Sequence, residues 1–411
     1  MLNKNNNVSL VVKANLCCSC GLCSNYCKQD AITYKINSLG FYEPIIEENK
    51  CTNCKICLKN CPGINDLKNY TQQEEFTFYG HSTDQELHLN ASSGGVATEL
   101  LCYLISHKIV DYVTCVSSRT DIQYPEQIIT NDINTIKQAR TSKYCPIKWN
   151  NIINQIERLD GTIAIIALPC QINSLKSYLQ KRELQHKIKF YLTLFCNHTP
   201  SLYAAEYIAQ GYGGKSIKLK SLINRGLGFP GYMSYSIEKE HKTIKFQTPY
   251  RKTWSAGYGL YFKNLRCSIC NDPFGKSADI AMGDSYFLQD SDTQGNTFCI
   301  IRNKELVKIL LDMKEKGIIN LKKGPDGKTI SKYYRILFER EDSFLKNNKC
   351  LQLLKHKSVI PPPIKANVSL RYLFNFYKRI YFMQLGKYRW LWPWLAKRKR
   401  LKNIITNIQQ P

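Results

Sequence analysis

The sequence contains no run of about 18 apolar residues, so we expect no transmembrane helix. Its first residues, MLNKNNNVSLVVKA, lack an apolar segment and a small-residue cleavage site, so they do not look like a secretory signal. Acidic residues are also scarce, with 32 Asp and Glu against 58 Lys and Arg. Residues 343–411 contain no acid at all but fifteen Lys or Arg. An anionic partner is therefore expected at this C-terminal segment.

Cysteine, in contrast, is abundant. The chain has 18 cysteines, and nine of them lie between Cys17 and Cys61. A protein that is not exported keeps most of its thiols reduced, so metal binding explains them better than disulfides. A chain of 411 residues, 43% of them hydrophobic, can bury a core without covalent cross-links. We therefore expect a cytoplasmic metalloprotein of about two or three domains.

Two copies of one cysteine motif lie in the N-terminal part. Both have the spacing C-x2-C-x2-C-x3-C, formed by Cys17, Cys20, Cys23 and Cys27 and by Cys51, Cys54, Cys57 and Cys61. Two-cluster ferredoxins use this spacing, and the fourth cysteine of each motif ligates the other motif's 4Fe-4S cluster. The expected sets are therefore Cys17, Cys20, Cys23 with Cys61, and Cys51, Cys54, Cys57 with Cys27. Two four-cysteine zinc sites are the alternative, and the extra Cys18 is expected to be a bystander.

Composition and pattern divide the chain into three parts. Residues 1–70 form the cysteine module, for which we expect an α+β ferredoxin-like fold with two 4Fe-4S clusters. A polar linker (65–75) leads to residues 76–340, which alternate strand and helix signals as in an α/β body. Residues 341–411 form a basic, aromatic helical tail that contains Pro361-Pro362-Pro363. In the body, strands are expected at Val110–Val116, Thr162–Leu168, Lys189–Phe195 and Asp279–Met282, and helices at Asn150–Arg158 and Leu202–Gln210.

Polar and thiol motifs follow three of these strands. They are Leu168-Pro169-Cys170-Gln171, Cys196-Asn197-His198 and Gly283-Asp284-Ser285. Parallel α/β sheets place ligand sites at the carboxyl ends of their strands, so we expect a site there. A further motif, Ser92-Ser93-Gly94-Gly95, opens a helix-like segment, where backbone N–H groups can approach a cofactor phosphate. A plain serine N-cap and turn would also explain it.

A series of short motifs follows a recognisable order along the body. They are Ser93-Gly94-Gly95, Ser142-Lys143-Tyr144, Pro169-Cys170-Gln171, Cys196 with Pro200-Ser201, Arg266-Cys267-Ser268-Ile269-Cys270, and the segment from Ala278 to Asp284. With the N-terminal cysteine motifs, they make the chain similar to the beta subunits of coenzyme F420 hydrogenase/dehydrogenase and their bacterial relatives. Many bacterial relatives look like members of polysaccharide-biosynthesis clusters. The residues after Cys196 and Asp284 depart from the family pattern, so a deazaflavin substrate does not follow.

The resemblance implies an iron-sulfur flavoprotein oxidoreductase, in which the clusters exchange electrons with FAD or another flavin that reduces or oxidises a small organic substrate. The alternative function is a non-catalytic electron-transfer subunit that docks a separate oxidoreductase. An electron donor or acceptor protein is an expected partner in either case. The implied flavin or phosphate contacts are Ser92, Ser93, Gly94, Gly95 and Lys143, for which a solvated lysine is the alternative.

Four cysteines of the body suggest a third cluster. Cys267 and Cys270 form a ligand-like pair that needs two partners, and Cys170 and Cys196 both stand at strand ends. We hypothesise that these four hold a third 4Fe-4S cluster. The alternative is that Cys170 or Cys196 is a free or redox-active thiol near the flavin.

The tail interleaves aromatic and basic residues. Ser369–Gln384 is rich in both, and it is followed by Trp390, Trp392, Trp394 and a basic run at 397–400. Rings and cations together suit an anionic membrane, which would place the protein at the inner face of the membrane. A helix that packs its rings on the body is a second interpretation, and nucleic-acid binding is a third. Nucleic acid is not expected, because no DNA-binding motif is found.

Overall fold

The computed structural model describes residues 6–64, 74–117, 124–149, 151–213, 219–239, 242–288, 294–354, 365–398 and 401–408. The expected linker at 65–75 lies mostly outside these ranges, and Pro361-Pro362-Pro363 lies wholly outside them. Within the described ranges, no helix combines the length and the apolar character needed to cross a membrane.

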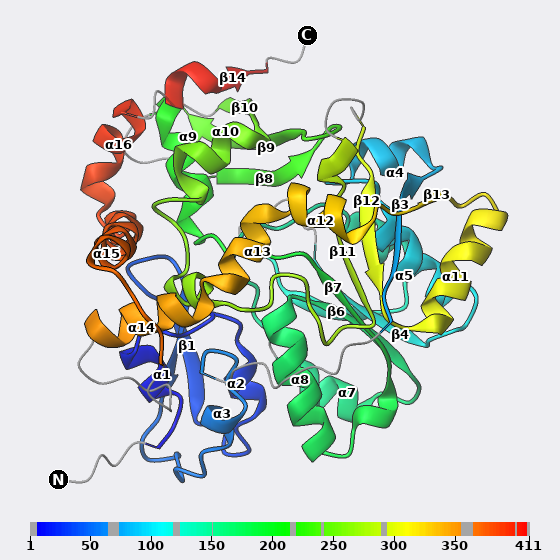
Figure 1. Ribbon diagram of the computed structural model, residues 1–411, viewed down its shortest axis with the longest axis horizontal. Helices are drawn as coiled ribbons and strands as arrows, with labels where there is room; N and C mark the ends of the chain where they lie inside the picture. The colour runs from blue at the N-terminus through cyan, green and yellow to red at the C-terminus, as the bar shows by residue number, and fades with distance from the viewer. Residues whose placement is uncertain are drawn as a thin grey trace.

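A large mixed sheet forms the centre of the molecule (Figure 1). Its eight described strands run in the order β13-β3-β12-β11-β7-β6-β4-β5. The four strands β11, β7, β6 and β4 are parallel to one another, and the outer pairs are antiparallel. The strands are β3 (Phe76–Ser82), β4 (Tyr112–Val116), β5 (Gln127–Thr130), β6 (Ile163–Ala167), β7 (Ile188–Leu194), β11 (Ile280–Asp284), β12 (Thr297–Ile301) and β13 (Ile319–Lys323).

The four parallel strands are the four that the sequence predicts. Each is a short, almost continuous apolar run, which is typical of strands that are buried on both faces. In β6, Ala164 packs into the core on one face of the sheet, and Ile163 and Ile165 pack into the core on the other. The expected α/β body is therefore confirmed.

Helices cover both faces of this sheet. Those on one face are α5 (Val96–Ser106), α6 (Ile133–Gln138) and α11 (Lys304–Glu315). Those on the other face are α7 (Ile152–Arg158) and α8 (Pro169–Lys181). The short helix α4 (Gln85–Asn90) precedes α5. The helix expected at Asn150–Arg158 is α7, and the one expected at Leu202–Gln210 is α9 (Tyr203–Gly213).

A second, antiparallel sheet lies beside the first, at the top of Figure 1. Its described strands run in the order β14-β10-β9-β8, where the C-terminal β14 pairs with β10. The core under this sheet contains side chains of α9 and of the tail helix α16. The elements are β8 (Leu219–Gly226), β9 (Tyr232–Lys239), β10 (Lys242–Pro249), α10 (Tyr250–Thr253), α16 (Trp392–Arg398) and β14 (Thr406–Asn407).

The described part of the N-terminal module, residues 6–64, contains one hairpin and three short helices, drawn in blue in Figure 1. These are α1 (Ser9–Lys13), α2 (Leu22–Asn25), β1 (Ile32–Ile36), β2 (Tyr42–Ile46) and α3 (Ile56–Lys59). The module shares one core with α7 and α8, and a second core with the helices α14 and α15. The remaining C-terminal helices are α12 (Gly327–Tyr333), α13 (Arg335–Asp342), α14 (Phe344–Leu354) and α15 (Leu370–Leu385).

Candidate functional site

The two cysteine motifs share one backbone shape. In each motif, a residue on either side of the second cysteine has positive φ: Ser19 (60°) and Gly21 (73°), or Asn53 (53°) and Lys55 (64°). Gly21 and Lys55 each begin a short helix, α2 or α3, that carries the third cysteine. Left-handed residues next to helical ones turn successive N–H groups to one side, which creates the concave anion site of many iron-sulfur proteins.

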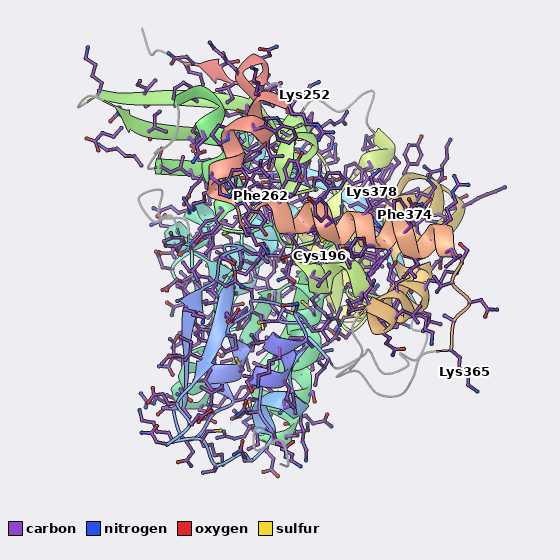
Figure 2. All side chains as sticks on the ribbon, turned by 90° about the vertical axis from the view of Figure 1, so that its left-hand side faces the viewer. Cys196, Lys252, Phe262, Lys365, Phe374 and Lys378 are labelled. Carbon is purple, nitrogen blue, oxygen red and sulfur yellow. The ribbon has the colours of Figure 1, made fainter. Side chains whose placement is uncertain are left out.

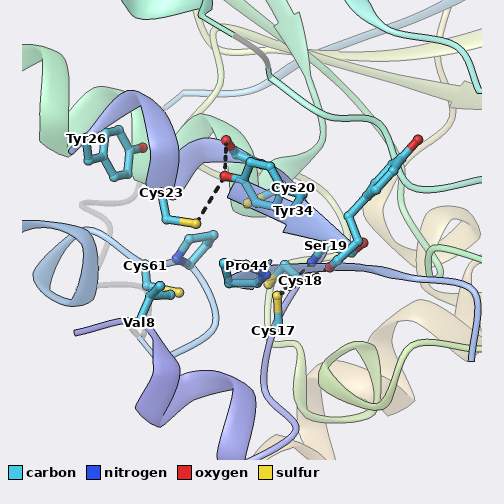
Figure 3. Close-up of a pocket in the computed structure, with 13 residues that line it drawn as sticks. Val8, Cys17, Cys18, Ser19, Cys20, Cys23, Tyr26, Tyr34, Pro44 and Cys61 are labelled. Atoms are coloured by element: carbon cyan, nitrogen blue, oxygen red, sulfur yellow. Dashed lines mark hydrogen bonds between the residues drawn. The ribbon is translucent and has the colours of Figure 1, made fainter. Parts of the chain in front are cut away.

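The first group of thiols surrounds one cavity (Figure 3). The cysteines that line it are Cys17, Cys18, Cys20, Cys23 and Cys61. Burial, together with the thiolates of Cys17 and Cys23, raises the pKa of Cys61. The N–H of Ser19 donates to Cys17 Sγ, and the N–H of Gly63 donates to Cys61 Sγ, both at 3.4 Å. Such N–H···S bonds stabilise thiolates that ligate a cluster.

The second group lies nearer the surface and contains Cys27, Cys51, Cys54 and Cys57. Burial raises the pKa of Cys57, and the thiolates of Cys54, Cys27 and Cys51 raise it further. The N–H of Ala31 donates to Cys27 Sγ at 3.4 Å, and Cys54 is exposed. The structure thus brings together both sets that the ferredoxin spacing predicts, with Cys27 and Cys61 exchanged between the motifs.

Four cysteines of the body form a third group. Cys170 is the second residue of α8 and lies shortly after β6, and Cys196 follows β7. Cys267 and Cys270 lie in and just after the 3-10 helix η3 (Leu265–Ile269). Because β6 and β7 are adjacent and parallel, their carboxyl ends place Cys170 and Cys196 at the same edge of the sheet. The N–H of Thr199, three residues after Cys196, donates to Cys267 Sγ at 3.5 Å, and the N–H of Cys196 donates to the Pro273 carbonyl oxygen, three residues after Cys270, at 2.9 Å. Burial and the thiolates of Cys267, Cys170 and Cys270 raise the pKa of Cys196.

Cys18, expected to be a bystander, is in contact with this third group. Its thiol lies beside that of Cys170, and this proximity together with burial raises the pKa of Cys170. Cys17 of the first group is therefore followed directly in the chain by Cys18, which contacts the third group. Arg266 of the body, which is 7% exposed, also contacts the cysteine module, because it donates to the Gly63 carbonyl oxygen at 2.6 Å.

Among the residues that the structure describes, no three His, Cys, Asp or Glu side chains are grouped closely enough to hold a single metal ion. A 4Fe-4S cluster has a different requirement, because each of its four thiolates binds a different iron. The three groups offer four cysteines each, and backbone N–H donors point at several of the sulfur atoms. This set of donors fits clusters of that kind.

The Ser92–Gly95 turn connects α4 to α5 and packs against β3 and β12 of the large sheet. Ser92 Oγ accepts a hydrogen bond from the N–H of Ser142 at 2.7 Å and donates to the Arg225 carbonyl oxygen at 3.3 Å. The two segments that the sequence predicts as flavin contacts, around Ser92 and around Lys143, therefore lie side by side.

Lys143 is partly buried, unlike the solvated lysine of the alternative interpretation. Its Nζ donates to the carbonyl oxygens of Ala139, Arg140 and Thr141 at 2.8, 2.8 and 3.0 Å. These bonds satisfy backbone groups after the C-terminal end of α6, where a cation is favourable. Burial lowers the pKa of Lys143 to about 8. The structure thus gives this ammonium a capping role beside the Ser92–Gly95 turn.

Close packing against the large sheet requires a glycine at position 94. A Cβ atom here would lie 2.3 Å from the Gly80 oxygen and 2.6 Å from the Thr297 nitrogen, both backbone atoms. We expect Gly94→Ala to lower the free energy of unfolding by about 1–3 kcal/mol, even in protein without flavin. Chemical denaturation measures this, with Gly327→Ala as control, because a Cβ at Gly327 meets nothing within 4 Å. Equal stabilities of the two variants would contradict the explanation.

The sequence did not predict a buried ion pair near this turn. Arg225 in β8, with a side chain 2% exposed, contacts Asp284 Oδ2 at the end of β11 at 2.7 Å. Its guanidinium also lies over the Tyr250 ring, 4.3 Å from the centroid. Arg225 Nη2 has no hydrogen-bond partner among the described residues. Asp284 was part of a motif at a strand end, whereas Arg225 had no signal in the sequence.

A buried ring and a partly buried ring, after the ends of β7 and β10, also carry buried polar atoms that lack a partner within the described ranges. These atoms are His198 Nδ1 and Trp254 Nε1, and the two rings lie 4.7 Å apart. Tyr144 lies 5.3 Å from Trp254, so it connects these rings to the Lys143 segment. Burial lowers the pKa of His198 well below its usual value, so the imidazole is neutral at pH 7. Buried polar groups without partners, set among aromatic rings, fit the polar edge of a planar cofactor such as a flavin.

Two models of one family match the body of the chain. The model for the beta subunit N-terminus of coenzyme F420 hydrogenase/dehydrogenase matches residues 77–154, and the model for its C-terminus matches residues 160–326. Residues 1–76 and 327–411 lie outside both matches.

Three curated relatives come from Methanocaldococcus jannaschii and Methanothermobacter thermautotrophicus. An uncharacterised protein of Methanocaldococcus jannaschii is 26% identical over 275 residues, which are 66% of this chain and 94% of that protein. The coenzyme F420-dependent sulfite reductase of the same organism is 23% identical over 45% of this chain and 31% of its own length. The coenzyme F420 hydrogenase subunit beta of Methanothermobacter thermautotrophicus is 24% identical over 49% of this chain and 69% of its own length.

A solved structure has a similar fold. It is a chain in the F420-reducing nickel-iron hydrogenase complex from Methanosarcina barkeri, matched with a TM-score of 0.52 and 18% identity over 71% of this chain and 98% of that chain. At this identity the likeness is one of fold. The two family models together match more than half of the chain. This chain therefore belongs to the coenzyme F420 hydrogenase/dehydrogenase beta subunit family.

Proposed function

We propose that this protein is an iron-sulfur flavoprotein oxidoreductase, in which three 4Fe-4S clusters exchange electrons with a flavin that reduces or oxidises a small organic substrate. The observation that carries the proposal is the contact between Cys18 and Cys170, which joins the cysteine module to the cysteines of the body. Two relatives are named as a hydrogenase subunit and a sulfite reductase, and both names describe redox enzymes.

The three cysteine groups form a chain of short links. Cys23 and Cys27 belong to different groups but lie four residues apart, as do Cys57 and Cys61. The first group then reaches the third through Cys18, which follows Cys17 in the chain and lies beside Cys170. In the proposed route, electrons pass between the second, first and third groups and onward to the flavin.

The flavin is proposed to lie between the Ser92–Gly95 turn and the unpartnered polar atoms at the strand ends. Arg225 and Trp254 would donate hydrogen bonds to its polar edge, and Tyr144 would contact its ring. A bound flavin can exchange two electrons with an organic substrate and single electrons with iron-sulfur clusters. The neutral His198 would remain uncharged beside it at pH 7.

A separate redox protein is proposed as the partner. This chain matches only 31% of the sulfite reductase, and another relative is named a subunit, so relatives work as parts of larger oxidoreductases. The same observation favours a second candidate function, a non-catalytic electron-transfer subunit. Substrate turnover by the purified single chain with a chemical reductant favours the enzyme. Turnover that begins only when a partner oxidoreductase is added favours the subunit.

The iron content of the protein tests the proposed clusters. Anaerobically purified protein should contain about twelve iron atoms and twelve sulfides per chain, with about one flavin released on denaturation. Cys170→Ala should leave about eight iron atoms, because it removes a ligand of the third group. Cys102→Ala, which changes a buried cysteine of α5 outside the groups, and Cys18→Ala are controls that should keep about twelve.

Some outcomes would contradict parts of this proposal. Stoichiometric zinc with negligible acid-labile sulfide would overturn the clusters. A Cys170→Ala variant that keeps all the iron of the wild type would remove the third cluster. Intact clusters in a protein that binds neither FAD nor FMN would leave the electron-transfer subunit as the better function.

A further inference from the structure

The helix α15 has two unlike faces. One face packs into the core that the tail shares with the N-terminal module, where Phe376 is 1% exposed. Met383, on the same face, is 7% exposed and its sulfur accepts a hydrogen bond from Ser268 Oγ. The opposite face carries apolar and aromatic side chains in contact with solvent. They are Leu370 (85% exposed), Phe374 (64%), Tyr377 (53%) and Tyr381 (57%). Their spacing of four, three and four residues aligns them as one outward stripe along the helix.

Basic side chains lie beside this stripe. Arg371 and Lys378 are exposed and fall on the same flank of the helix, seven residues apart. Neither makes an ion pair within the part of the chain that the structure describes. Figure 2 shows Phe374 and Lys378 on α15 where it crosses the face turned towards the viewer.

The surface continues at both ends of α15. Near its N-terminal end, a groove of about 600 Å³ is lined by residues that include Lys346, Lys349 and Tyr372. Beyond its C-terminal end, Trp390 is 77% and Trp394 53% exposed. Large rings that remain in water at this degree of exposure gain free energy when a partner covers them.

We infer that the outward stripe of α15 docks on an anionic phospholipid surface. Residues 343–411 carry fifteen cations and no acid, so a negatively charged surface complements them and a second copy of the same face would be repelled. A convex stripe of rings with cations on its flank is the arrangement that places side chains at the headgroup level of a bilayer, with Trp and Tyr at the interface. The helix lies in the plane of the surface, and its inner face holds it to the module.

Vesicle binding by the full-length protein tests this inference. At about 0.15 M salt, the protein should bind vesicles of phosphatidylglycerol and phosphatidylcholine at least about tenfold more tightly than phosphatidylcholine alone. Reversing two charges in Arg371→Glu/Lys378→Glu should weaken binding on the order of 30-fold or more. Removing rings in Phe374→Ala/Tyr377→Ala/Tyr381→Ala should weaken it at least about tenfold, and this loss should persist at high salt.

The matched control for charge is Lys322→Glu/Lys323→Glu. These two exposed lysines lie on β13, on the opposite side of Figure 1 from α15, and the change in net charge is the same. The control should bind vesicles like the wild type, and all variants should keep the thermal unfolding midpoint of the wild type. Equal binding to both vesicle types would overturn the inference, as would an equal loss in the control. Binding to single-stranded DNA but not to vesicles would also overturn it, in favour of nucleic acid.

Discussion

Replacing Asp284 by asparagine should lower the free energy of unfolding by about 3–5 kcal/mol. The reason is the environment of its partner. Arg225 has a side chain that is only 2% exposed, and it contacts Asp284 Oδ2 at 2.7 Å. Without the carboxylate, the guanidinium charge stays buried without an anionic partner, and most of its desolvation cost is no longer offset. Denaturant unfolding of protein without flavin measures this effect separately from cofactor binding.

An exposed ion pair provides the control for this change. Glu74 contacts Lys304 at 3.0 Å, and the two side chains are 61% and 74% exposed. Glu74→Gln should therefore cost less than about 1 kcal/mol, because water screens the pair. The double variant Arg225→Met/Asp284→Asn should be more stable than Asp284→Asn alone, since it leaves no buried charge. A double variant that is less stable than Asp284→Asn would show that the arginine contributes mainly by packing.

Trp392→Ala should cost about 3–5 kcal/mol as well, because it removes a large ring from a close-packed core. Trp392 in α16 is 0% exposed. Its ring centroid lies 5.5 Å from that of Phe262 and 6.0 Å from that of Tyr207. Its indole Nε1 donates to the Gly386 carbonyl oxygen at 2.9 Å. The unfolding midpoint, followed by circular dichroism, reports the loss.

Trp390, two residues earlier, makes a closely matched control. Its side chain is 77% exposed, so Trp390→Ala should change the free energy of unfolding by no more than about 0.5 kcal/mol. A large difference between the two variants means that the tail is an integral part of the fold. Similar small effects for both would mean that α16 contributes little to the core under the second sheet.

The parallel strands were predictable because their sequences determine their environment. A run such as residues 163–167, with no polar residue, can be buried on both faces of a sheet and is hard to place elsewhere. The strands β8 to β10 were not predicted. In β10, exposed lysines alternate with more buried residues such as Phe246, so it lacks a continuous apolar run. The edge strand β14 has two residues and carries almost no pattern.

The cysteine groups followed from two different kinds of information. Local spacing gave the sets of the module, because the short segments between cysteines restrict where each thiol can point. Topology gave the body set, because neighbouring parallel strands bring Cys170 and Cys196 to one edge. The role of Cys18 was missed, since its contact with Cys170 spans two parts of the chain that no local pattern connects.

The tail shows why ring burial cannot be predicted from the sequence. Phe374 and Phe376 are two residues apart and chemically identical, yet one is 64% and the other 1% exposed. The helical period separates them, and the position of the module decides which face is covered. The interpretation of a helix that packs its rings on the body holds for some of the rings, such as Phe376, whereas others, such as Phe374, remain outward. The membrane interpretation stays a prediction. The ion pair of Arg225 is a similar case, because its partner lies 59 residues away.

The contrast between Gly21 and Lys55 gives the cysteine module an inside and an outside. A Cβ at Gly21 would lie 3.0 Å from the Trp149 nitrogen, so the first motif is pressed against the body. Lys55 has the same left-handed conformation but extends an exposed side chain, and Cys54 beside it is also exposed. In the proposed electron route, the first cysteine group would face the body, and the second group, which contains Cys54, would face solvent. A separate redox protein would then dock on the side of the second group where Cys54 is exposed. A bulky group attached to the Lys55 side chain would block this docking.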